Sequence, residues 1–122
     1  MIEQLQGFPA TVLAFAGHGQ VTKADYVSVL VPAVETAFAG HDRIRLYYEI
    51  GADFTGIDAD AMLEDFKIGM RHLTRWERIA VVTDVQWIAH AMLLFSFLIP
   101  GGMKAFATAD TKQARSWITA PG

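Results

Sequence analysis

The sequence predicts one α/β domain over residues 1–122, with a five-stranded, mostly parallel sheet and four helices in the order β-β-α-β-α-β-α-β-α. Segments rich in branched and aromatic residues alternate with segments whose apolar residues recur at helical spacing, and no linker or repeat interrupts them. A short turn separates the first two strand-like segments, so we expect an antiparallel first strand. A helix joins each later strand to the next, which makes those strands parallel through right-handed crossovers.

The chain is expected to begin with a hairpin. Residues 2–6 are a weak strand that Gly7 and Pro9 end, and residues 11–19 are a stronger, nearly continuous apolar strand. The turn between them favours a tight reversal of the chain.

A first long helix is predicted over residues 22–39. Thr22 and Asp25 have the spacing of a capping box, and Pro32 should bend the axis because it removes a backbone hydrogen bond. The residues expected to face the sheet are Tyr26, Leu30, Val34, Ala37 and Phe38.

The middle of the chain predicts a strand over residues 43–50, a loop over residues 51–58 and a helix from the N-cap Asp58 to about Thr74. We expect Gly69 to allow a close approach of this helix to the sheet. The apolar stripe expected to be buried is Met62, Phe66, Met70 and Leu73.

The last third predicts the most apolar strand over residues 78–84, and this strand is expected at the centre of the sheet. An apolar helix follows over residues 85–99 and ends at a proline and two glycines. A last strand over residues 103–109 and a last helix over residues 110–118 complete the fold.

Composition excludes several classes of protein. The chain has no cysteine and a formal net charge of -3, so it offers neither disulfides nor a basic face for nucleic acid. The N-terminus lacks the basic region of a signal peptide, and no apolar run reaches the roughly 20 residues of a membrane-spanning helix. We therefore expect a cytoplasmic domain with no transmembrane segment.

Several motifs in order resemble the bacterial SpoIIAA-like family of STAS-type domains. They are "LVPAVETAF", "RLYYEIGADFTG", "HLTRWERIAVVTDVQWIAHA", "FLIPGGMKAF" and "QARSWI". The resemblance covers nearly the whole chain and implies the fold shared by anti-sigma-factor antagonists and CRAL-TRIO lipid-binding domains. The first of these relatives is a phospho-switched protein-binding module and the second carries a small apolar ligand, so the resemblance leaves the function open.

A phospho-switch is one function that the resemblance implies. In the anti-sigma antagonists a serine after the third strand is phosphorylated, and the matching loop here contains Thr55 beside Gly56 but no serine pair. Asp53, Asp58 and Asp60 crowd this loop and would oppose the charge of a phosphate. Thr55 is therefore a weak candidate, and a plain turn residue is the alternative.

No catalytic, metal or cofactor site is predicted. His18 and His41 are expected to be exposed without partners, His72 lies near a helix end, and His90 has no ligand residue at helical spacing. Sharp nucleophile elbows and glycine-rich phosphate loops are missing from the sequence. We expect a protein that is not an enzyme.

The helix over residues 85–99 carries the candidate interaction or ligand patch. One side should lie on the sheet, while the other side holds a mainly apolar set: Trp87, His90, Leu93, Leu94 and Phe97. This patch can be the core of a homodimer, a wall of a pocket for an apolar ligand, or a surface for a membrane or partner protein. The last helix, with Trp117, can also cover it within the domain.

The sequence thus predicts a non-enzymatic binding or regulatory STAS-like module that acts through protein-protein interaction and homodimerisation. The alternative is a carrier or sensor of a small, lipid-like apolar ligand. Native mass spectrometry separates the two, because only a carrier brings a bound ligand through purification.

Overall fold

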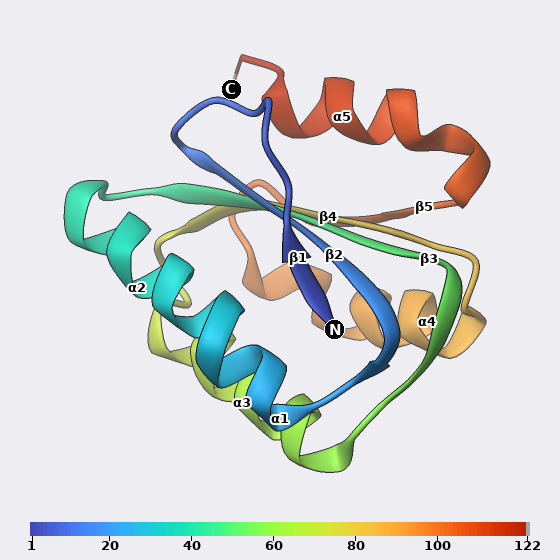
Figure 1. The fold of residues 1–122 in the computed structure, drawn as a ribbon. Coiled ribbons are helices and arrows are strands. Elements are labelled where there is room, and N and C mark those ends of the chain that lie inside the picture. The colour runs from blue at the N-terminus through green and yellow to red at the C-terminus, as the bar shows by residue number, and fades with distance from the viewer. Residues whose placement is uncertain (122) are drawn as a thin grey trace.

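The computed structural model describes residues 1–121 as a five-stranded mixed sheet with helices on both faces (Figure 1). The elements are β1 (Ile2–Gln4), β2 (Val12–Val21), α1 (Lys23–Asp25), the π-helical turn η1 (Tyr26–Leu30), α2 (Val31–Gly40), β3 (Ile44–Ile57), α3 (Ala59–Arg71), β4 (Trp76–Thr83), α4 (Gln86–Phe95), the 3-10 turn η2 (Ser96–Leu98), β5 (Met103–Phe106), the 3-10 turn η3 (Thr108–Asp110) and α5 (Thr111–Thr119). The predicted fold class and order of elements are confirmed, with α1, η1 and α2 forming the one long helix that was expected.

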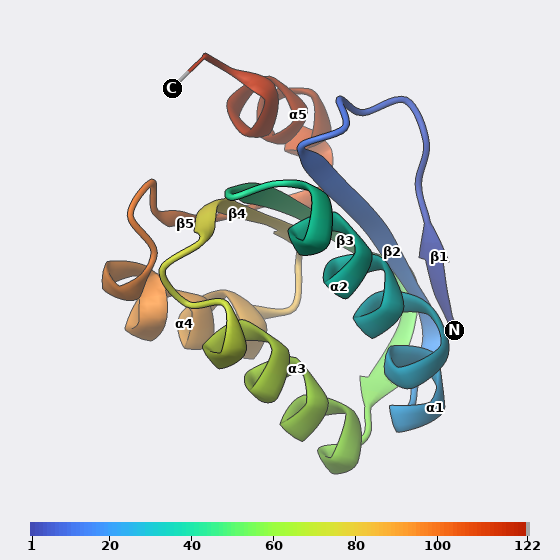
Figure 2. The ribbon, with the colours of Figure 1, turned by 90° about the vertical axis from the view of Figure 1, so that its left-hand side faces the viewer.

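The strands lie in the sheet in chain order, β1-β2-β3-β4-β5. β1 pairs antiparallel with β2, and the other three pairs are parallel. Right-handed crossovers between sequential parallel strands place every connecting helix on the same face of the sheet. Accordingly α1 to α4 lie on one face and α5 alone lies on the other (Figures 1 and 2).

The centre of the sheet is β3 rather than the predicted strand over residues 78–84. β3 is also longer than expected, because residues 51–57 continue the strand where a loop was predicted. β2 extends to Val21 and pairs with this part of β3, through register shifts on both sides of Gly19. Gly19 has a φ of 58°, a conformation that glycine adopts without strain, so it lets the pair follow the bend.

The long helix begins with the expected capping box, in which the Thr22 hydroxyl accepts a hydrogen bond from the Asp25 amide and the Asp25 carboxylate accepts one from the Thr22 amide. The irregularity at Pro32 is a π-helical turn just before it, where the Val31 amide donates to the Tyr26 carbonyl. Proline has no amide hydrogen, so the widened turn accommodates the hydrogen bond that Pro32 cannot make.

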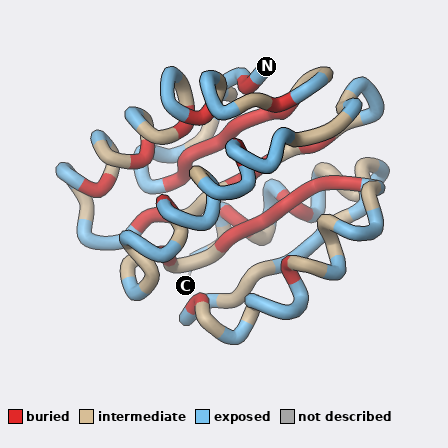
Figure 3. Tube along the Cα trace, turned by 90° about the horizontal axis from the view of Figure 1, so that it is seen from below, coloured by how far each residue is buried: buried red, intermediate tan, exposed pale blue. Residues whose placement is uncertain are grey.

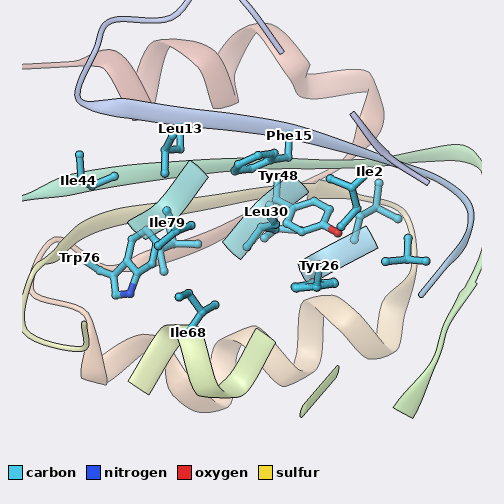
Figure 4. Close-up of a cluster of buried hydrophobic side chains, with 14 of the residues drawn as sticks. Ile2, Leu13, Phe15, Tyr26, Leu30, Ile44, Tyr48, Ile68, Trp76 and Ile79 are labelled. Carbon is cyan, nitrogen blue, oxygen red and sulfur yellow. The ribbon is translucent and has the colours of Figure 1, made fainter. Parts of the chain in front are cut away.

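Two apolar cores lie on opposite faces of the sheet. Figure 4 shows residues of one of them, and Figure 3 shows which positions along the chain are buried. The larger core packs the strands against the long helix through residues such as Phe15, Leu30 and Trp76. The smaller core packs the other face against Ala114 and Ile118 of α5. Buried positions are concentrated in the strands, whereas the helices carry mainly intermediate and exposed positions.

Two arginines of the sheet bind the end of α5. Arg45 of β3 donates to the carbonyls of Ile118 (3.0 Å) and Ala120 (2.5 Å), and Arg78 of β4 donates to those of Trp117 (2.9 Å) and Ala120 (3.1 Å). The last carbonyls of a helix have no partner within the helix, so these cations satisfy them and complement its dipole.

His18 links the N-terminal strand to the centre of the sheet. Its Nδ1 lies 2.8 Å from Asp53 Oδ2, and its Nε2 lies 3.0 Å from Glu3 Oε1, so the prediction of a partnerless histidine is wrong. The hydrogen bonds to Asp53 and Glu3 raise the pKa of His18 above its usual value. The two ring nitrogens point to different carboxylates, and residues 1–121 contain no cluster of three side chains suited to a metal ion.

None of the helices within residues 1–121 combines the length and the apolarity that crossing a membrane requires.

The His18 contacts predict a pH-dependent stability. A histidine with a raised pKa in the folded state stabilises below its unfolded pKa, and that stabilisation is lost as the pH rises through the folded value. We expect His18→Gln to lower the melting temperature at about pH 6, with a smaller effect at about pH 9. Thermal melts of both proteins at the two pH values check this. His41→Gln is the control, and an equal loss for His18→Gln at both pH values would contradict the prediction.

Candidate functional site

A cavity of about 390 Å³ lies between the sheet and the helices α3 and α4. β3, β4 and β5 form its floor, and the two helices form its walls. The lining is almost entirely apolar, and its members include Leu46, Ile79, Val81, Met92 and Met103. A cavity of this size in a chain of 122 residues is large enough for a small molecule.

The cavity exists because the two walls are supported by different parts of the fold. α3 packs mainly on α1 and η1, whereas α4 packs on β4 and β5. The sheet between these supports is therefore not covered directly by either helix.

The expected buried stripe of α3 borders this cavity. Met62, Phe66 and Met70 were predicted to be buried, but each is about half exposed, so this prediction is wrong. Their side chains face the opening between the helices rather than the sheet, and all three line the cavity. Gly69 does not allow the expected close approach either, since a Cβ added there would meet nothing within 4 Å.

α4 contributes the opposite wall. Met92 and the following Ile99 are buried against the sheet, as the helical spacing predicted. Phe95 and Trp87 line the cavity and are half exposed, so they lie at its rim. Trp87 is the member of the predicted patch that reaches the cavity.

The rest of the predicted patch forms the outer face of α4 and of the turn η2 that follows it. Leu93, Leu94 and Phe97 are 64%, 71% and 80% exposed, and His90 is also exposed. α5 and Trp117 lie on the other face of the sheet, so the expectation that they cover this patch is wrong (Figure 2). The structure therefore brings Trp87 to the cavity and leaves the other four residues facing outward.

Asp65 is an exposed carboxylate of α3 that also lines the apolar cavity. It lies one turn after Ala61 and three residues before Ile68, the two buried residues of α3, so it is on the same side of the helix as they are. The Tyr26 hydroxyl donates a hydrogen bond of 2.9 Å to its Oδ1.

The environment of Asp65 disfavours its charge. Burial raises the pKa of Asp65, and the hydrogen bond from Tyr26 opposes that rise only in part. Burial, together with the Asp65 charge, also raises the pKa of Tyr26, and burial raises the pKa of the neighbouring Tyr48 to about 12. Both tyrosines are therefore neutral hydroxyls at physiological pH. A hint was present in the sequence, since a buried tyrosine such as Tyr26 needs a hydrogen-bond partner.

Trp76 is a further residue of the cavity lining that sequence reasoning missed. It is 2% exposed and lines the cavity, and its ring meets Phe38 edge-on at 4.9 Å. Figure 4 shows its indole nitrogen pointing away from the sheet, toward the helical layer that contains Ile68. Within residues 1–121 this nitrogen is the buried side-chain polar atom without a hydrogen-bond partner. Burying such a group costs about 1–3 kcal/mol.

Thr55 lies apart from the cavity. It is exposed in the extension of β3, three residues before Asp58, the N-cap of α3. Phosphorylation of Thr55 stays a prediction. His72, another of the histidines considered, stacks on Phe38 and lies 3.2 Å from Glu35, so it has a structural partner.

Comparison with known proteins identifies relatives of the fold. The model of the SpoIIAA-like family matches residues 12–119. The crystal structure of an uncharacterised protein from Shewanella loihica PV-4, described as having a SpoIIAA-like fold, is similar with a TM-score of 0.74 and 25% sequence identity. The similarity covers 97% of this chain and 92% of that protein. Curated proteins gave no match.

The raised pKa of Asp65 predicts a cost in stability. An acid whose pKa is raised by folding destabilises the protein above that pKa, and the cost disappears as the pH falls below the unfolded value. We expect Asp65→Asn, which keeps an acceptor for Tyr26, to raise the free energy of unfolding at pH 7.

Urea unfolding of both proteins between about pH 4 and pH 7 checks this. The difference should shrink toward the acidic end. Asp60→Asn, in the first turn of the same helix, is the control, and an Asp65→Asn protein less stable than the native chain at pH 7 would contradict the prediction.

Proposed function

Since the chain belongs to the SpoIIAA-like family, whose fold does not by itself specify an activity, we propose that it is a non-enzymatic binding module for a small apolar molecule. The observation that carries this proposal is the apolar cavity between the sheet, α3 and α4. It develops the ligand-carrier alternative of the sequence analysis.

The size and lining of the cavity support a ligand. Protein interiors are packed at close to crystal density, and voids larger than a water molecule are few. A cavity of about 390 Å³ falls within the range of sites for small molecules, which are mostly apolar with a few polar groups. Asp65 and the Tyr26 hydroxyl that binds it are such polar groups.

The rim of the cavity supports exchange with solution. Phe66 and Met70 on α3 face Trp87 and Phe95 on α4, and all four are about half exposed. Large apolar side chains in such a position would lose their water contacts when an apolar molecule binds. Each Å² of apolar surface removed from water contributes about 25 cal/mol.

A second candidate function is homodimerisation through the outer face of α4. α4 carries no Asp, Glu, Lys or Arg. Leu93 and Leu94 in this helix, and Phe97 just after it, are its most exposed large apolar residues. A two-fold interface brings the same patch of both copies together, and an uncharged apolar patch meets no like-charge repulsion there. This face and the cavity lie on different sides of the same helix, so the two functions are compatible.

Filling the cavity should separate binding from stability. Gly69→Leu places a side chain where a Cβ meets open space within the cavity lining. It should raise the free energy of unfolding by about 1 kcal/mol, because glycine is a poor helix former. It should also weaken binding of the neutral fluorescent probe N-phenyl-1-naphthylamine about tenfold, because it occupies the site.

Gly40→Leu is the matched control, because a Cβ at Gly40 also meets open space but lies outside the cavity lining. It should leave probe affinity unchanged. If the native chain does not bind the probe, or if Gly69→Leu binds it as well as the native chain, the ligand proposal is wrong.

Charging the outer face of α4 tests self-association. Leu93→Asp should convert a dimer into a monomer in analytical ultracentrifugation, because a buried unpaired carboxylate opposes association. Leu63→Asp, at an exposed leucine of α3 outside the cavity lining, should leave the dimer intact. A native chain that sediments as a monomer at all concentrations would rule out the homodimer.

A further inference from the structure

The rim of the cavity is exposed in the single chain. Five large apolar residues line the cavity and are nonetheless about half exposed: Met62, Phe66, Met70, Trp87 and Phe95. Sites for small molecules enclose most of the surface of their ligand. An apolar molecule between α3 and α4 would keep part of its surface in water at this rim, and that part would contribute nothing to affinity. One copy of the chain therefore encloses the site only in part.

The exposed apolar surface continues from the rim onto the outer face of α4. Leu94 follows Trp87 by seven residues, or about two helical turns, so both side chains lie on the same side of the helix. Leu93 and Phe97 extend the surface further, and Phe97 in η2 is its most exposed member. The rim and the outer face of α4 thus form one continuous apolar surface.

The area of this surface is that of one side of a stable interface. An aromatic side chain buries about 150–250 Å² when it is fully enclosed. At half exposure or more, the aromatic residues of the surface together offer roughly 400–500 Å². These residues are Phe66, Trp87, Phe95 and Phe97. The exposed Leu and Met residues add a comparable area, and each partner of a standard interface contributes about 800 Å².

The charges around this surface favour a second copy over a membrane. α4 and η2 carry no Asp, Glu, Lys or Arg, so two copies of this region meet without like-charge repulsion. An anionic lipid surface would instead be held by basic residues beside the apolar face. The two cations of α3 are paired within the chain, Lys67 with Glu64 and Arg71 with Glu35.

A two-fold pair through α4 brings the second copy to the cavity. Helix dipoles favour an antiparallel arrangement of the two α4 helices, because opposite ends then lie together. Trp87 is near the start of α4, whereas Phe97 follows its end. In an antiparallel pair, Phe97 of the partner subunit therefore lies beside Trp87 at the rim of the cavity.

We propose that a second copy of this chain completes the ligand site, with Phe97 of the partner subunit covering the opening between α3 and α4. This inference rests on the proposed function, because it names the partner that closes the same cavity. Each cavity of the dimer takes part of its wall from the other subunit, so ligand binding and dimerisation stabilise each other.

Mixing two defective variants tests the proposal. Phe97→Ala keeps its cavity but offers no cover to the other subunit, whereas Gly69→Leu fills its own cavity but still offers Phe97. Each variant alone should bind N-phenyl-1-naphthylamine about fivefold to tenfold more weakly than the native chain. Mixed in equal amounts, at a concentration where the native chain is dimeric, they should regain native affinity at about one site for every four chains, because about half of the dimers are mixed and each has one complete site.

Two controls accompany the mixture. A chain with both substitutions should restore nothing when it is mixed with Phe97→Ala, because neither copy then supplies Phe97. Leu63→Ala, at a half-exposed residue of α3 outside the cavity lining, should bind the probe as the native chain does. Phe97 is exposed, so Phe97→Ala should melt at the native temperature when measured as a dilute monomer.

The outcomes distinguish this inference from the proposed function. If the native chain binds the probe and Gly69→Leu weakens it, but the mixture binds no better than its components, the inference is overturned and the binding function stands. A native chain that stays monomeric and co-sediments with vesicles of phosphatidylglycerol would assign the surface to a membrane and overturn the inference as well. If the native chain does not bind the probe at all, the proposed function fails and the inference fails with it. Restored binding in the mixture, and none with the doubly substituted chain, supports the inference.

Discussion

The handedness of the crossovers governs this molecule. Four sequential parallel strands joined by right-handed connections put all their helices on one face of the sheet. α1 with α2, then α3, then α4 must share that face, and only α5, which follows the last strand, is available for the other face. One face is therefore covered by several helices that need not meet one another, and the cavity lies where α3 and α4 diverge.

A polar contact supports α3 in this arrangement. Because α3 packs on α1 and η1 rather than on the sheet, the hydrogen bond from Tyr26 to Asp65 joins the two helical segments directly beside the cavity. Hydrophobic packing would favour an apolar residue at position 65. The carboxylate at this position instead accepts the Tyr26 hydroxyl, so the contact between the two helical segments includes a hydrogen bond.

Much of the fold could be predicted because its signals are local. The capping box at Thr22, the turn after the first strand and the change of hydrophobic period all act within a few residues. The cavity could not be predicted in this way, since a helical wheel gives the direction of a side chain but not the distance to its neighbour. The helical spacing predicts Phe66 to be a core residue, whether its side chain packs on the sheet or borders an opening. The inward position of Asp65 depends on which neighbour supports α3, and that is a property of tertiary packing.

The hydrogen bonds from Arg45 and Arg78 to the end of α5 make the two faces of the sheet differ in how firmly their helices are held. One face is locked by charge-assisted hydrogen bonds to helix carbonyls, so the strands form a stiff plate. The other face carries α4, which packs on β4 and β5, and α3, which packs mainly on α1 and η1 and so has fewer direct contacts with the sheet. We therefore expect the domain to open locally on the side of α3 and α4, while the sheet and α5 stay in place.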